Sequence, residues 1–189
     1  MKLKNIKISN YRCFKEAEIG FDNHITLVVG KNGAGKTAIL DAVAVSVSTF
    51  LLGIDGGVSR SILKDDARYE FHDLNGTIDP QHQFPVCIES TGACLDQQNV
   101  KWIRSLNSES GKTTIKDAGE LTGLAKKAQN QIMTGDKSLV LPLISYYGTG
   151  RLYAQKKEYE FALNPIPLYY KTYEEPHLGI HPQWEGREF

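Results

Sequence analysis

The stretch VVGKNGAGKTAILDAV, residues 28–43, constrains the fold most, because a glycine-rich loop there joins a strand-like run to a helix-like run. Residues 30–37 carry the complete spacing Gly-x-x-x-x-Gly-Lys-Thr. Glycines let the backbone wrap an anion with its N–H groups inward, and the following helix points the positive end of its dipole at the same place. The pattern therefore predicts a loop that holds a nucleoside triphosphate. We call residues 30–37 the phosphate loop.

The residue types in the phosphate loop predict a role for each position. Lys36 is placed to reach the β- and γ-phosphates, and the Thr37 hydroxyl is the candidate ligand for Mg²⁺. The candidate nucleotide-binding residues of this stretch are Asn32, Gly33, Ala34, Gly35, Lys36, Thr37 and Ala38. A second GKTT, residues 111–114, has Leu106 where the first glycine of the motif should stand, and we interpret it as a hairpin turn.

Composition bounds the class of protein. The chain has 189 residues, which fits one domain or one lobe of a larger one, and its net charge is zero. The three cysteines have neither zinc-site nor disulfide-framework spacing. The basic N-terminus lacks a signal-peptide core, and the longest apolar run, residues 38–52, is shorter than a membrane span. We expect a soluble, cytoplasmic protein that has no membrane partner.

Hydrophobic periodicity predicts an α/β chain. Strand-like patterns cover residues 2–11, 16–22, 24–30, 84–90, 100–106, 113–117 and 138–147, and helix-like patterns cover residues 36–52 and 118–133. The β-branched run at 24–30 and the run at 138–147, which contains Pro142, are both of the kind that is buried in a sheet. Residues 53–83 give no clear pattern, and the prolines after residue 163 argue against regular structure.

The opening segment resembles the SMC, RecF and OLD group of ABC-type ATPases. The resemblance rests on a first strand, Asn-Tyr-Arg-x-Phe at residues 10–14, a second strand, and a third strand that enters GKNGAGKT. It implies a P-loop NTPase of the ABC-type head, with a mixed sheet plus an antiparallel β layer, ATP and Mg²⁺ as cofactors, and a homodimer or higher homo-oligomer at full length. We expect an N-terminal lobe with parts at residues 1–52, 53–137 and 138–189.

The same resemblance implies further site residues. Tyr11 and Arg12 would lie near the adenine or ribose, and Arg151 would lie near the nucleotide, with Gln155 as a candidate for the family's Q-loop glutamine. From the residues alone, Tyr11 is equally a core aromatic and Arg12 equally a surface cation. A solvated turn residue remains the alternative for Arg151, and a surface helix residue for Gln155.

A second resemblance is narrower. LPLISYYGTGRLY, residues 141–153, is similar to bacterial AAA-type ATPases of anti-phage modules such as Septu and some retrons. It implies an ATPase subunit of a defence complex in which a nucleotide-driven dimer clamp controls a nuclease of the HNH type. A repair or chromosome-maintenance ATPase of the RecF or SMC kind is the alternative, and a non-hydrolysing, nucleotide-bound scaffold is another.

Several parts of a complete ATPase are missing from this sequence. The best imitation of a Walker B strand, SILKDD at residues 61–66, is interrupted by Lys64, and no Leu-Ser-Gly-Gly signature is present. DLNG at 73–76 imitates a GTPase switch, but no Asn-Lys-x-Asp guanine reader accompanies it. We therefore expect hydrolysis to require the full-length protein.

Two further groupings lie in the last third of the chain. His177 and His181 have helical metal-site spacing between prolines that disfavour a helix. The aromatic and lysine residues of that third make nucleic acid a candidate partner, and an interface or core face is the alternative that we prefer.

Overall fold

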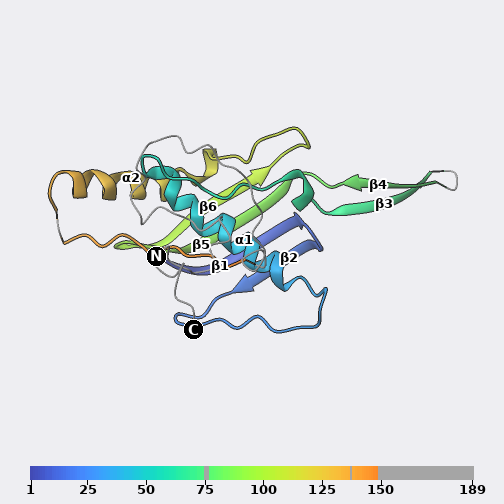
Figure 1. The fold of residues 1–189 in the computed structure, drawn as a ribbon, viewed down its shortest axis with the longest axis horizontal. Coiled ribbons are helices and arrows are strands. Elements are labelled where there is room, and N and C mark those ends of the chain that lie inside the picture. The colour runs from blue at the N-terminus through green and yellow to red at the C-terminus, as the bar shows by residue number, and fades with distance from the viewer. Residues whose placement is uncertain (75–76, 137, 149–189) are drawn as a thin grey trace, which may run out of the picture. The chain divides into compact units, whose positions relative to one another are not determined.

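The computed structural model describes residues 1–74, 77–136 and 138–148, which Figure 1 draws in colour. The chain divides into two compact units, Met1–Pro142 and Leu143–Phe189. Arg151, Gln155, His177, His181 and the aromatic residues after position 148 lie outside the described residues. The predictions made for them stay predictions.

A four-stranded antiparallel sheet forms the base of the first unit. Its order is β2-β1-β5-β6, with β1 at Lys2–Tyr11, β2 at Phe14–Gly20, β5 at Val86–Cys94 and β6 at Gln97–Leu106. In β1 the apolar Ile6 and Ile8 are fully buried, whereas Lys7 between them is exposed. This alternation is typical of an antiparallel sheet with one face on the core and one face in water.

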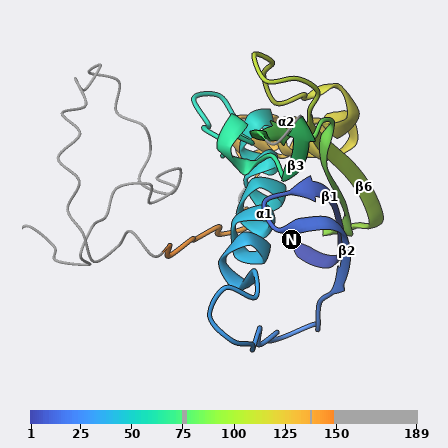
Figure 2. The ribbon, with the colours of Figure 1, turned by 90° about the vertical axis from the view of Figure 1, so that its right-hand side faces the viewer.

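Helix α1, Lys36–Ser48, covers the inner face of this sheet and continues into the short helix η1, Thr49–Gly53 (Figure 2). The indole nitrogen of Trp102 on β6 donates to the Ser46 carbonyl at 3.0 Å. The stretch Lys36–Gly53 has the length and apolar composition of a membrane span, yet 56% of it is buried inside the structure. A core helix of a soluble protein passes the same test of length and composition.

Helix α2, Gly119–Met133, lies where the spacing predicts a helix, and the short helix η3, Lys116–Ala118, precedes it. Its buried face contains Leu121, Leu124, Ala125 and Ala128. The segment before and within α2 also closes the outer edge of β6. There the Glu120 carboxylate accepts from the Lys101 amide at 3.2 Å, and the Thr114 hydroxyl accepts from the Ser105 amide at 3.1 Å. These bonds satisfy edge groups that would otherwise invite pairing with another chain.

A separate two-stranded hairpin, which we call the arm, was not predicted. It comprises β3, Tyr69–Leu74, and β4, Thr77–His82, and follows the short helix η2, Lys64–Asp66. Figure 1 shows the arm extending away from the four-stranded sheet. Its register places Tyr69, Phe71 and Ile78 on one face, and all three side chains are exposed.

Two predicted strands are absent from the structure. Residues 24–30 are not a strand, and Ile25, Leu27 and Val29 are 80–83% exposed. The described residues 138–148 likewise form no strand, and Val140 and Leu143 are more than 80% exposed. A fully buried strand needs hydrogen-bonded neighbours and cover on both faces, and no other described segment pairs with either stretch.

A third predicted strand, residues 113–117, is also wrong. Gly111 does close a turn on Ser108, but only Thr114 then pairs with the backbone of β6. The Thr113 hydroxyl instead holds Ile62 through that residue's amide and carbonyl, at 2.8 and 3.1 Å. The α/β class with an antiparallel layer is confirmed.

Candidate nucleotide-binding site

The phosphate loop turns through two left-handed glycines before α1 begins. Gly33 has φ +83° and Gly35 has φ +88°. Gly35 is the N-cap of α1, which has no side-chain capping bond and no acidic residue in its first turn. The amino end of a 13-residue helix therefore opens onto the loop with its dipole uncompensated. This is the arrangement that favours a phosphate group at a helix N-terminus.

The side chains that pack beneath the phosphate loop explain why Gly35 must be glycine. A Cβ atom built there would lie 2.5 Å from the Phe14 ring and 2.7 Å from Cys13 Sγ. Cys13 belongs to the two-residue turn between β1 and β2, and Phe14 begins β2. The turn thus packs directly against the backbone of the loop.

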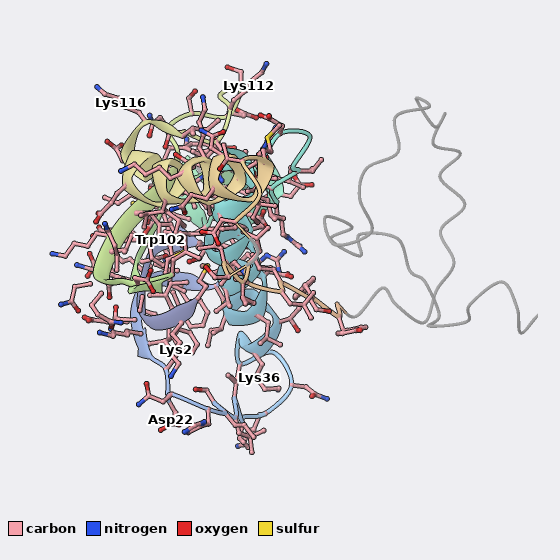
Figure 3. The ribbon with its side chains drawn as sticks, turned by 90° about the vertical axis from the view of Figure 1, so that its left-hand side faces the viewer. Lys2, Asp22, Lys36, Trp102, Lys112 and Lys116 are labelled. Carbon is pink, nitrogen blue, oxygen red and sulfur yellow. The ribbon has the colours of Figure 1, made fainter. Side chains whose placement is uncertain are left out.

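Lys36 folds back over the loop. Its ammonium donates to the carbonyls of Gly30 and Lys31, at 2.7 Å each. An ammonium group has three donors, so these two bonds leave one donor. Figure 3 shows Lys36 where the loop meets α1. The positive charge of Lys36 is therefore held beside the phosphate loop, where it would contact an anion bound there.

The other predicted loop residues divide into two groups. Asn32, Gly33, Ala34 and Thr37 are exposed and accessible to a ligand, whereas the Ala38 side chain is buried in the core beneath the loop. Ala38 can therefore contribute only its backbone to an anion. These positions fit a triphosphate through backbone amides and one lysine.

Thr37 is exposed, and its role as a ligand of Mg²⁺ stays a prediction. Mg²⁺ sites usually add carboxylates and substrate phosphates. Among the described residues no group of three or more His, Cys, Asp or Glu side chains could hold a metal ion.

Arg12 stands at the centre of an ion-pair network. Its Nε atom lies 2.8 Å from Asp66 Oδ1, and its Nη1 atom pairs with Asp41. Arg60 reaches the other oxygen of Asp41 at 3.1 Å. Asp41 and Asp66 are only 4% and 5% exposed, so both charges are buried and compensated. The predicted contact of Arg12 with a nucleotide stays a prediction.

Tyr11, the neighbour of Arg12, is fully buried in the core cluster beneath α1. Burial, together with the nearby Asp66 carboxylate, raises the pKa of Tyr11, so its phenol is neutral at ordinary pH. The structure thus gives Tyr11 the role of a core aromatic. Its side chain is not placed to stack on an adenine in this conformation.

Four supporting residues were not identified from the sequence. They are Cys13, Phe14, Asp41 and Asp66. Phe14 and Asp41 lie in quoted motifs, and Asp66 lies in the imitation of a Walker B strand. Only their three-dimensional contacts show that Cys13 and Phe14 pack against Gly35 and that Asp41 and Asp66 both pair with Arg12.

A family model described as an AAA domain matches residues 5–175. The chain is 46% identical over 44 residues to the DNA double-strand break repair Rad50 ATPase of Archaeoglobus fulgidus, which covers 23% of this chain and 5% of that protein. It is 39% identical over 69 residues to the DNA replication and repair protein RecF of Chlorobium phaeobacteroides, which covers 36% of this chain and 18% of that protein.

The chain therefore spans less than a fifth of the length of either relative. Among solved structures, an SMC ATPase aligns with a TM-score of 0.42 at 18% identity, over 66% of this chain and 80% of the other.

Proposed function

We propose, from the premise that this chain belongs to the AAA domain family, that it binds ATP with Mg²⁺ in the phosphate loop. The observation that carries this proposal is a loop with two left-handed glycines at the uncapped start of α1, in which the Lys36 ammonium is held by the carbonyls of Gly30 and Lys31. A triphosphate would replace the carbonyls of Gly30 and Lys31 as the partner of Lys36. The bond from the ammonium to a phosphate would join two ionised groups, whereas in the bonds to the carbonyls only the donor is ionised.

The protein that contains this lobe would act as an SMC- and RecF-like ATPase. Two copies would close around bound ATP and separate after hydrolysis, as the resemblance of residues 3–43 implies. The names of the Rad50 and RecF relatives support DNA repair as the process and DNA as the partner. A homodimer is the assembly that such an SMC- and RecF-like ATPase would form.

A second candidate function is favoured by residues 141–153. Their resemblance to ATPases of Septu-type and retron-associated modules supports a defence complex with an HNH-type nuclease subunit. The two candidates share the nucleotide site and differ in the partner. In the full-length protein, turnover stimulated by double-stranded DNA without a second subunit favours repair, and a requirement for a co-purifying nuclease favours defence.

The nucleotide class is tested by competition. A fluorescent ATP analogue is bound to the protein and displaced with unlabelled ATP or GTP in the presence of Mg²⁺. We expect ATP to displace the probe at lower concentration, because no guanine-reading motif accompanies the loop. Equal or tighter binding of GTP would contradict the adenine assignment while leaving the phosphate contacts intact.

A further inference from the structure

We propose that Asp66 is a positioning residue for the phosphate loop and acts on it through Arg12. This inference rests on the proposed binding of ATP. It concerns a residue that lies 30 positions after Lys36 in the sequence, in a helix of three residues ahead of the arm. Asp66 does not line the loop, so any influence on the loop must pass through its partners.

Asp66 accepts hydrogen bonds from the turn that contains Arg12. Its Oδ1 atom accepts from Arg12 Nε at 2.8 Å, and its backbone carbonyl accepts from the Arg12 amide at 2.7 Å. Its Oδ2 atom accepts from the Leu63 amide at 2.9 Å, which fixes the carboxylate itself. Asp66 therefore restrains both the side chain and the backbone of Arg12.

The turn that contains Arg12 needs such a restraint. Arg12 has φ +49° and Asn10 has φ +50°, which are left-handed conformations for residues that carry a Cβ. For Arg12 this conformation costs about 1–2 kcal/mol in an unsupported chain, and for Asn10 it costs less, because asparagine adopts it more readily. The Asn10 carbonyl accepts from the Arg68 amide at 2.9 Å. The segment of residues 66–68 therefore holds the turn in its strained form from one side.

The turn at residues 12–13 is linked to the phosphate loop by two sets of contacts. Cys13 and Phe14 fill the space under Gly35, so a shift of the turn would change the floor of the loop. Arg12 also pairs with Asp41 on α1. Asp41 lies four residues after Thr37, and positions i and i+4 share one face of a helix. The turn is thus tied to the loop backbone and to the helix that presents Thr37.

A purely structural role for Asp66 makes different predictions. Buried ion pairs contribute little net stability, but removing one partner of such a pair is destabilising. Asp66→Asn keeps the shape of the side chain and removes its charge, and the exposed neighbour Asp65 provides a matched control in Asp65→Asn. Cys13, an exposed residue whose sulfur packs against Gly35, reports on the turn without nucleotide.

The experiment measures three quantities for each variant: thermal unfolding, the rate of iodoacetamide labelling of Cys13 without nucleotide, and the affinity for Mg-ATP. For Asp66→Asn we expect a changed rate of Cys13 labelling and an affinity lowered by about three- to thirty-fold. Asp65→Asn should match the wild type in both. If Asp66→Asn does not fold, Asp66→Glu, which keeps the charge but moves the carboxylate, is measured in the same way.

The double variant tests whether Asp66 acts through Arg12. In an Arg12→Gln background, Asp66→Asn should lower the affinity by less than twofold further, because the contact is already lost. A full additional loss there would overturn the proposal, as would a lowered melting temperature with unchanged Cys13 labelling and unchanged affinity. Wild-type protein that binds no ATP, with Cys13 labelling still altered in Asp66→Asn, would refute the proposed function but not the link from Asp66 to the turn.

Discussion

At Gly35 the backbone has φ +88°, and the Phe14 ring occupies the space where a side chain would begin. Both facts forbid a Cβ, for different reasons: one concerns the backbone conformation and the other concerns packing. Lys36, the next residue, begins α1 and reaches back to two carbonyls of the loop. Loop shape and loop charge are therefore set by adjacent residues.

The three cysteines should differ in reactivity in a way that reports on the site. Cys13 is exposed beside Gly35, whereas burial raises the pKa of both Cys87 and Cys94. Because the thiolate is the reactive form, we expect iodoacetamide to label Cys13 first. Mg-ATP should slow this labelling by covering the loop.

Mass spectrometry of the labelled peptides measures both effects. Lys36→Ala serves as the control, because it should remove the protection by Mg-ATP while leaving the order of labelling unchanged. Labelling of Cys94 ahead of Cys13 would contradict the packing of the turn described here.

At the scale of elements, α1 is held between the sheet and the segment that follows it. The Arg104 side chain of β6 is 1% exposed and donates to Thr49 Oγ1 at 3.2 Å and to Ser59 Oγ at 3.3 Å. Burial lowers the pKa of Arg104. Its position at the carboxyl end of α1 also places a cation at the negative end of the helix dipole.

The contact of η1 with α2 depends on a glycine. A Cβ at Gly53 would collide with the backbone carbonyl of Thr122 and approach the Ala125 side chain to 2.7 Å. We expect Gly53→Ala to lower the free energy of unfolding by about 1–3 kcal/mol, because the two elements must separate. Gly123→Ala has open space on α2 and should raise it by up to about 1 kcal/mol.

Urea unfolding of the two alanine variants compares the same substitution in two environments. Equal effects of the two substitutions would show that helix propensity, and not the close approach of η1 to α2, decides the stability of this region.

Elements with a strong local pattern were predictable from the sequence. The alternation in β1 and the i, i+3, i+4 spacing in α2 locate both elements well. The arm was missed because Glu70, His72 and Asp79 make its strands polar and Pro80 interrupts β4. The prediction of a strand at residues 24–30 was wrong for the opposite reason. These residues suit a buried strand, but burial depends on neighbours that the local pattern does not encode.

In the candidate site, too, the local motif was predictable and the contacts between distant segments were not. The phosphate loop was predictable because its spacing is local, from Gly30 to Thr37. Its support was not, because Arg12, Asp41 and Asp66 come from three separate segments and meet only in the fold. A charged residue in a short polar stretch gives no sign of its partner.

At the scale of the whole molecule, the sequence carries a phosphate loop but no ABC-type signature. In the family that it resembles, the signature of one subunit completes the nucleotide site of the other. We therefore expect the 189-residue chain to bind ATP without forming an ATP-dependent dimer and without turning ATP over. Light scattering with and without Mg-ATP, together with a phosphate-release assay, measures both. A nucleotide-induced doubling of mass that Lys36→Ala abolishes would show that the dimer interface is complete within this chain.

The central claim is that the phosphate loop holds a triphosphate through Lys36, and titration calorimetry with Mg-ATP tests it most directly. Lys36→Ala should bind about ten- to hundred-fold more weakly than the wild type, because it loses charge-assisted bonds of about 1.5–3 kcal/mol. Lys112→Ala, in the second GKTT, is the matched control and should bind as the wild type does. Equal affinity of Lys36→Ala and the wild type, or a loss in Lys112→Ala alone, would contradict the assignment of the site.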